Sequence, residues 1–88
     1  EDFVNVSQNR PNPFRNSTEI TVNIFKDADL QLTITNLIGQ EVLYIEKSGL
    51  QKGEYIFAID GSNWENGVYF YTLVTASQRV TKKMILHR

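Results

Sequence analysis

The chain has 88 residues, enough for one domain whose single small core hides a little over ~60% of the surface of the unfolded chain. It contains no cysteine, which excludes disulfide bonds and thiolate metal sites. Its 9 basic and 10 acidic residues give a net charge of −1, and this balance predicts no binding to nucleic acid or to an anionic membrane surface.

The beginning of the sequence indicates a piece of a longer protein. It reads Glu-Asp-Phe-Val, with no initiator methionine and no segment of signal-peptide type. No apolar run approaches the ~18 residues of a membrane-spanning helix, so no membrane insertion is predicted. We therefore expect residues 1–88 to form a single module, excised from a longer polypeptide that continues upstream.

An alternation of apolar and polar residues with a period of two dominates the chain and predicts half-buried strands. In chain order, the expected strands cover residues 3–6, 20–24, 30–35, 41–45, 54–59, 68–75 and 79–86. The alternation predicts a core that contains Ile20, Val22, Ile24, Leu30, Leu32 and Ile34. Turn residues such as Gly39, Gly49 and Gly53 separate the strands, and residues 63–66 could form one helical turn. The pattern predicts an all-β, immunoglobulin-like antiparallel sandwich of about seven strands.

The segment NGVYFYTL near the end of the chain has apolar residues on both faces of its expected strand. We expect Tyr69, Tyr71 and Leu73 to point inward and Phe70 to be partly exposed. In immunoglobulin-like sandwiches, a tyrosine at the start of such a strand donates its hydroxyl group to upstream backbone. Tyr69 occupies that position.

The sequence offers no catalytic constellation, so we predict neither an enzyme nor a cofactor or metal site. His87 is the only histidine and lies next to the last residue, where fraying is expected. The loop from Asp60 to Glu65 carries oxygen ligands, but its spacing is not that of a calcium loop and favours an Asx-turn. Trp64 could stack on a sugar ring, although a lid over one end of the core is the favoured interpretation.

Several motifs occur in an order that resembles the C-terminal sorting domain of type IX secretion cargo, in its type A form. They are Gln8-Asn9, Pro11-Asn12-Pro13-Phe14, Ser17-Thr18, Leu37-Ile38-Gly39-Gln40-Glu41-Val42, Leu50-Gln51-Lys52-Gly53, Gly67-Val68-Tyr69-Phe70-Tyr71 and Lys82-Lys83-Met84-Ile85-Leu86. The resemblance spans roughly residues 8–88.

The resemblance implies a small immunoglobulin-like sandwich at the C-terminus of a protein from Bacteroidetes-type bacteria. It implies a targeting signal that acts by being recognised, moving an attached N-terminal cargo from the periplasm to the cell surface or the medium. The implied partners are outer-membrane components of the type IX system and a cysteine protease that acts as a sortase and usually removes the domain.

The tail from Arg79 to Arg88 has two interpretations. Its lysines could protect an edge strand from aggregation, or the strand could add to a partner's sheet edge while a lysine meets acidic groups. The residues alone favour protection, and the resemblance favours docking. With docking, loss of the tail should affect export more than folding. The candidate recognition residues are Gly67, Val68, Tyr69, Lys82, Lys83, Met84, Ile85, Leu86 and Arg88.

Two functions from other classes stay open at this point. The chain could be a carbohydrate-binding or spacer sandwich attached to a secreted enzyme, or a structural domain of an adhesin.

Overall fold

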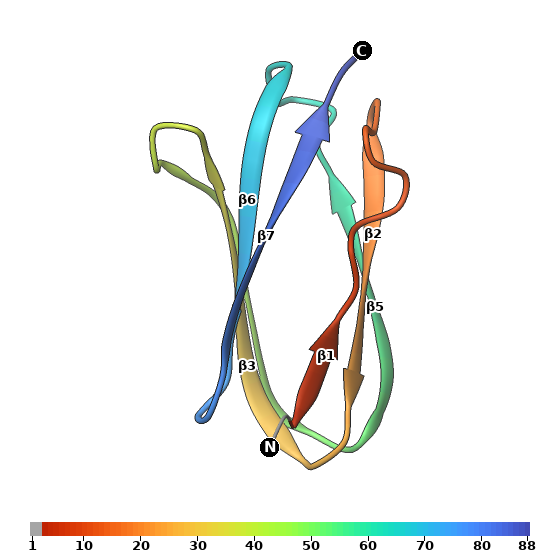
Figure 1. Cartoon of the computed structure of the whole chain (residues 1–88), viewed down its shortest axis with the longest axis vertical. Coiled ribbons are helices and arrows are strands. Elements are labelled where there is room, and N and C mark those ends of the chain that lie inside the picture. The colour runs from red at the N-terminus through yellow and green to blue at the C-terminus, as the bar shows by residue number, and fades with distance from the viewer. Residues whose placement is uncertain (1–2) are drawn as a thin grey trace.

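Two antiparallel sheets packed face to face form the domain in a computed structural model that describes residues 3–88 (Figure 1). The strands are β1 (Val4–Val6), β2 (Ser17–Ile24), β3 (Ala28–Asn36), β4 (Glu41–Leu50), β5 (Gly53–Asp60), β6 (Gly67–Val74) and β7 (Arg79–Leu86). This all-β arrangement confirms the predicted sandwich. No helix within residues 3–88 is long and apolar enough to cross a bilayer.

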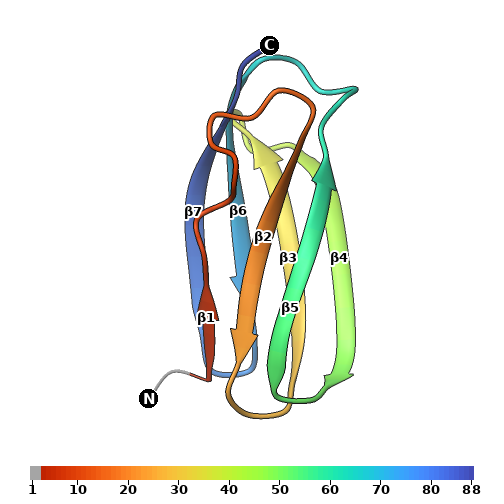
Figure 2. The ribbon, with the colours of Figure 1, turned by 90° about the vertical axis from the view of Figure 1, so that its right-hand side faces the viewer.

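The strand order is β1-β2-β5 in one sheet and β4-β3-β6-β7 in the other (Figure 2). The hairpins β3–β4 and β6–β7 stay within the larger sheet, whereas the chain crosses between sheets from β2 to β3, from β4 to β5 and from β5 to β6. Each sheet therefore has two edge strands. On one side of the sandwich these are β1 and β7, and on the other they are β4 and β5.

The core lies between the sheets and follows the predicted alternation. The six predicted core residues of β2 and β3 are all 2% exposed or less. From β6, Tyr69, Tyr71 and Leu73 point inward and Phe70 is half-buried, as expected. Because successive side chains of a strand point to opposite faces, the inward choice for Tyr71 fixes the orientation of all of β6.

Two local expectations were wrong. The sequence placed a turn at Gly49, but β4 continues to Leu50 through a register shift against β3 between Ala28 and Leu30. Gly49 adopts φ +67° there, which glycine tolerates without steric cost, and its N–H donates to Asp29 Oδ1 at 2.7 Å. Residues 63–66 form no helical turn. The Trp64 N–H bonds to the Gly61 carbonyl at 3.0 Å and closes a single turn, and the chain then bends toward β6.

Leu32 offers a direct test of the core. It is fully buried at the middle of β3, so Leu32→Ala should lower the free energy of unfolding by about 2–5 kcal/mol through lost burial and a residual cavity. The adjacent, exposed Gln31 is the control, and Gln31→Ala should change stability by about 0.5 kcal/mol or less. Denaturant unfolding measures both, and equal stability of the two variants would contradict the assigned core.

Candidate recognition surface

The β6–β7 ladder brings the predicted recognition residues together. In its register Gly67 faces Leu86, Val68 faces Ile85 and Tyr69 faces Met84. Lys82 and Lys83 follow on the same strand, opposite Tyr71 and Phe70. Arg88 lies just beyond the end of this ladder, where Asn66 Oδ1 accepts its backbone N–H at 2.9 Å. Eight of the nine predicted residues thus belong to one ladder, and the ninth lies at its end.

Burial divides these residues into two groups. Tyr69, Met84 and Leu86 are 5%, 0% and 1% exposed, so a partner cannot contact their side chains without opening the core. Val68 and Ile85 are half-buried, and they face each other on the outer side of the sheet. The outward residues of β6 and β7 are therefore the accessible part of the predicted set.

The two lysines point to opposite faces and do not form one cationic site. Lys82 pairs with the inward-facing Tyr71, whereas Lys83 pairs with Phe70 on the outer face. Lys82 is half-buried and Lys83 is exposed. A charged side chain on the core-facing side of an edge strand is a common protection against pairing with another chain. This placement favours edge protection for Lys82, and Lys83 is the lysine available on the outer face.

The outer edge of β7 is occupied by the segment between β1 and β2 (Figure 2). Phe14 forms a parallel bridge with Leu86: its N–H donates to the Ile85 carbonyl and its carbonyl accepts from the His87 N–H, both at 2.9 Å. Further along, Asn12 Oδ1 accepts the Ile85 N–H at 2.9 Å and Gln8 Nε2 donates to the Lys83 carbonyl at 2.8 Å. A partner strand could pair with this part of β7 only after displacing residues 8–14.

Asn9 ties the same segment to the core. It is 1% exposed, and its backbone N–H donates to the Tyr71 hydroxyl oxygen at 3.0 Å. Its side-chain amide donates to the Pro11 carbonyl and to Thr18 Oγ1 at 3.1 and 3.0 Å, and its Oδ1 accepts from Gln8 at 2.6 Å. The Tyr71 hydroxyl in turn donates to the Ser7 carbonyl at 2.8 Å. Buried polar groups are tolerated when they are bonded in this way.

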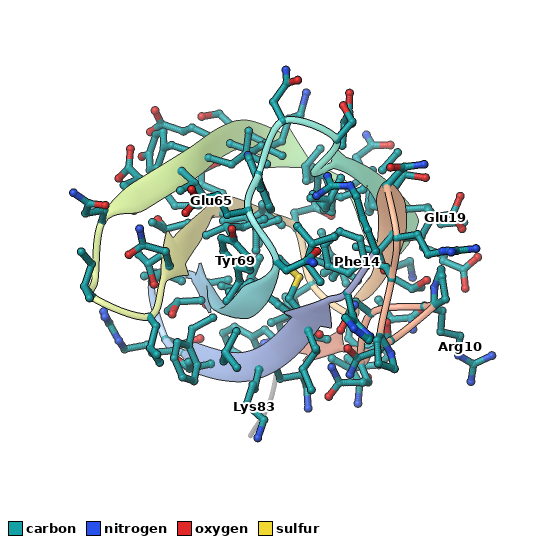
Figure 3. All side chains as sticks on the ribbon, turned by 90° about the horizontal axis from the view of Figure 1, so that it is seen from above. Arg10, Phe14, Glu19, Glu65, Tyr69 and Lys83 are labelled. Atoms are coloured by element: carbon teal, nitrogen blue, oxygen red, sulfur yellow. The ribbon has the colours of Figure 1, made fainter. Side chains whose placement is uncertain are left out.

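Phe14 closes this end of the sandwich, which Figure 3 views from above. Its ring is fully buried against Gly61, and Trp64 contacts the same glycine. Trp64 is half-buried and lies 5.1 Å from Tyr69 between ring centroids, so the lid interpretation is confirmed and the indole is not a free stacking platform for a sugar. The Tyr69 hydroxyl donates to the Glu65 carbonyl at 2.6 Å, as the predicted tyrosine corner requires.

The end of the chain is anchored, which corrects one expectation. Fraying was expected at His87, but its backbone N–H bonds to Phe14. The guanidinium group of Arg88 donates to the carbonyl oxygens of Trp64 and Gly61 at 2.7 and 2.6 Å, and its Nε donates to Asn16 Oδ1 at 3.3 Å. That loss of the tail affects export more than folding stays a prediction. Because alternate residues of β7 point into the core, deletions in the tail remove core side chains.

The described residues contain no group of three or more His, Asp or Glu side chains that could hold a metal ion. In the loop that offered oxygen ligands, Asp60 Oδ1 accepts the Ser62 N–H at 2.9 Å. This is the predicted Asx-turn, and hydrogen bonding from the backbone and the side chain of Ser62 lowers the pKa of the Asp60 carboxyl group. The arrangement at this end of the molecule therefore consists of packing and hydrogen bonds.

Together these features define a class of protein. It is a small β-sandwich in which hydrogen bonds join the last strand to the first connecting segment, and its outer face is accessible for recognition. Comparison with family models gives the particular family. The chain matches the model of the secretion system C-terminal sorting domain over residues 10–87, and it belongs to this family. None of the curated proteins compared with it matches.

Membership defines the role of the domain. It is a C-terminal sorting signal for type IX secretion, which works by being recognised and not by catalysis. The role implies interaction with the type IX machinery, an attached N-terminal cargo, and a secreted or cell-surface protein.

Sequence reasoning missed the part that residues 8–14 play. The motif Pro11-Asn12-Pro13-Phe14 entered only through the resemblance, and nothing in its spacing indicated contacts with β7. Its partners lie about as far away in sequence as the chain allows, as in the bond between Asn12 and Ile85. The available signal was chemical: Asn12 lies between Pro11 and Pro13, and asparagine and proline are typical of turns in which the asparagine side chain bonds to nearby backbone.

Tyr71 should make stability depend on alkaline pH. Burial raises the pKa of its hydroxyl group to about 12, although the hydrogen bond from Asn9 acts in the opposite direction. The unfolded state loses this proton near pH ~10, while the folded state keeps it. The contribution is thus complete below pH ~10 and is lost as pH rises toward 12. In urea titrations from pH 8 to pH 12, the wild type should lose stability more steeply than Tyr71→Phe, and parallel curves would contradict this.

Gly61 tests the packing under Phe14. A Cβ atom at this position would lie 2.9 Å from Phe14 Cε2 and 3.1 Å from Trp64 Cε3, closer than van der Waals contact. Gly61→Ala should therefore lower the free energy of unfolding by about 1–3 kcal/mol through overpacking. Asn63→Ala, an exposed change in the same loop, should be neutral within about 0.5 kcal/mol. A neutral Gly61→Ala in thermal unfolding would show that the ring does not rest on this glycine.

Proposed function

We propose that the folded domain is recognised at the outer membrane by components of the type IX system while its cargo is in transit through the periplasm. A sortase-like cysteine protease then removes the domain from the cargo. In this proposal residues 1–88 are one C-terminal sorting domain that follows a longer secreted protein. The match to the sorting-domain family over residues 10–87 carries the proposal.

The folded surface, and not an extended peptide, is the form that we propose is read. Met84 and Leu86 are core residues, and residues 8–14 occupy the edge of β7. An extended peptide would have to be pulled out of the core, at the cost of several large buried side chains. The outer-face residues Val68, Lys83 and Ile85 are accessible without this cost.

The direction of the chain also supports recognition of this end. β1 begins beside the turn between β2 and β3, because Val4 pairs with Ile24 and the Phe3 carbonyl accepts the Phe25 N–H. β7 ends beside Gly67 and Phe14, at the opposite end of a molecule 37 Å long (Figure 1). A cargo attached upstream of β1 would thus enter at the far end and leave the end of β7 open to a partner.

The test uses the whole chain fused to a fluorescent cargo in a host with the type IX system and in a mutant host without it. Wild-type fusion should reach the medium or the cell surface only in the first host. Lys83→Glu with Ile85→Ser should leave folding intact and shift cargo toward the periplasm, because both side chains lie on the outer face. Leu86→Ala should lower the thermal midpoint, because this side chain is 1% exposed.

The matched control lies at the other end of the same ladder. Val74 and Arg79 face each other on the outer side, so Val74→Ser with Arg79→Glu makes the same chemical change away from the end of β7. Export of this control should equal that of the wild type. If the wild-type fusion stays inside the competent host, the sorting role fails, and if both double variants are exported alike, the assigned surface is wrong.

A further inference from the structure

The hairpin between β3 and β4 exposes two large apolar side chains at its tip. Leu37 is 68% and Ile38 is 79% exposed, more than any other large apolar side chain within residues 3–88. Burying such side chains would stabilise the fold, and neither position gains this stabilisation. Adjacent exposed apolar residues at one tip are typical of an interaction site more than of a fold requirement. We call residues 36–40 the β3–β4 tip.

The β3–β4 tip is held in a defined shape. Asn36 Oδ1 accepts the N–H groups of Ile38 and Gln40 at 3.1 and 2.9 Å, and its side-chain amide donates to Gln40 Oε1 at 2.8 Å. The Asn36 backbone adds bonds to the Gln40 carbonyl and from the Gly39 N–H at 2.9 and 3.0 Å. Gly39 has φ +88°, a conformation that glycine adopts most readily. A partner would therefore meet the two apolar side chains on a backbone that is already ordered, and little backbone entropy would be lost on binding.

The tip lies at the same end of the sandwich as the end of β7 (Figure 1). A shallow cleft separates it from the start of β6, and its walls include Ile38, Gln40, Asn66 and Val68. Val68 is also the partner of Ile85 across the β6–β7 ladder. The tip is therefore continuous with the outer-face surface assigned to recognition.

The charges around the tip are acidic. Glu41 begins β4 directly after the tip, and Glu65, labelled in Figure 3, lies on the far wall of the cleft. Both side chains are exposed. No lysine or arginine occurs in residues 27–46 or 53–78, which include the tip and both walls of the cleft. The guanidinium group of Arg88, which lies at this end, is directed to the carbonyl oxygens of Trp64 and Gly61. A partner that fits this surface has an apolar pocket with basic side chains at its rim.

We infer that the β3–β4 tip inserts Leu37 and Ile38 into an apolar, basic-rimmed pocket on a protein component of the secretion machinery. This inference rests on the proposed sorting function and adds a contact point outside the last strand. The exposed apolar pair supplies the buried centre of the contact, and the two glutamates supply the polar rim.

The experiment measures export of a fluorescent cargo fused to the whole chain in a type IX-competent host. Leu37→Ser with Ile38→Ser should reduce export at least tenfold, while the thermal midpoint stays within a few degrees of the wild type because both side chains are exposed. Phe25→Ser with Ile56→Ser is the matched control. These residues are 58% and 56% exposed and lie outside the tip and its cleft, so this variant should be exported like the wild type.

A second arm tests the charge of the pocket. Glu41→Lys with Glu65→Lys should reduce export severalfold, whereas Glu46→Lys with Glu54→Lys, which alters two exposed glutamates away from the tip, should not. Normal export of the Glu41→Lys, Glu65→Lys variant would contradict the inference that the partner's pocket has basic side chains at its rim.

Each remaining outcome separates this inference from the sorting role. If the wild-type fusion is not exported, the sorting role itself fails. If the wild type and the tip variant are exported alike, the tip is no contact point, although the sorting role stands. Sedimentation of the purified domain covers a second copy as the occupant: a wild-type dimer that becomes a monomer in the tip variant would also overturn the inference.

Discussion

The hydrogen bond from the Asn9 backbone N–H to the Tyr71 hydroxyl oxygen is the interaction on which the arrangement of this end of the molecule depends. It holds Asn9 against the inward-facing Tyr71 of β6, and this position allows Phe14, further along the same segment, to bridge to Leu86 at the edge of β7. A buried amide and a buried hydroxyl would be costly without partners. Here the Asn9 side-chain amide donates to Pro11 and Thr18, and the Tyr71 hydroxyl accepts the Asn9 backbone N–H and donates to the Ser7 carbonyl. Within residues 3–88, no buried side-chain nitrogen or oxygen atom lacks a hydrogen-bond partner.

One side of the sandwich is closed by side chains as well as by backbone. At the β7 edge, Gln8 and Asn12 bond to the strand. At the β1 edge, Gln78 Oε1 accepts the N–H groups of Phe3 and Val4 at 2.6 and 2.9 Å. Such caps satisfy backbone groups that could otherwise pair with another chain. A targeting domain with this closure can present a defined surface without exposing an adhesive edge on that side.

The sequence was informative where structure is local. The alternation at residues 20–24 and 30–35 identified core residues correctly, because a period of two dictates which face each side chain takes. It failed at Gly49, since a glycine at a β-bulge and a glycine at a turn look alike without the partner strand. For the candidate surface, the sequence predicted β7 but not the segment of residues 8–14 that bonds to its outer edge. The contact of Phe14 with Ile85 and Leu86 depends on how the sheets pack, which local pattern does not encode.

The lock between residues 8–14 and β7 joins the first part of this domain to the last. A chain that stops before β7 leaves Phe14 without its backbone hydrogen-bond partners. Tyr69 of β6 then lacks its neighbour Met84, and the Gly61 carbonyl lacks the hydrogen bond from Arg88. Such a product lacks the core residues Met84 and Leu86 and has no β7 at the edge of the larger sheet. The complete fold therefore requires β7, the last strand to be translated, and a chain that terminates before this strand lacks the contacts that complete the domain.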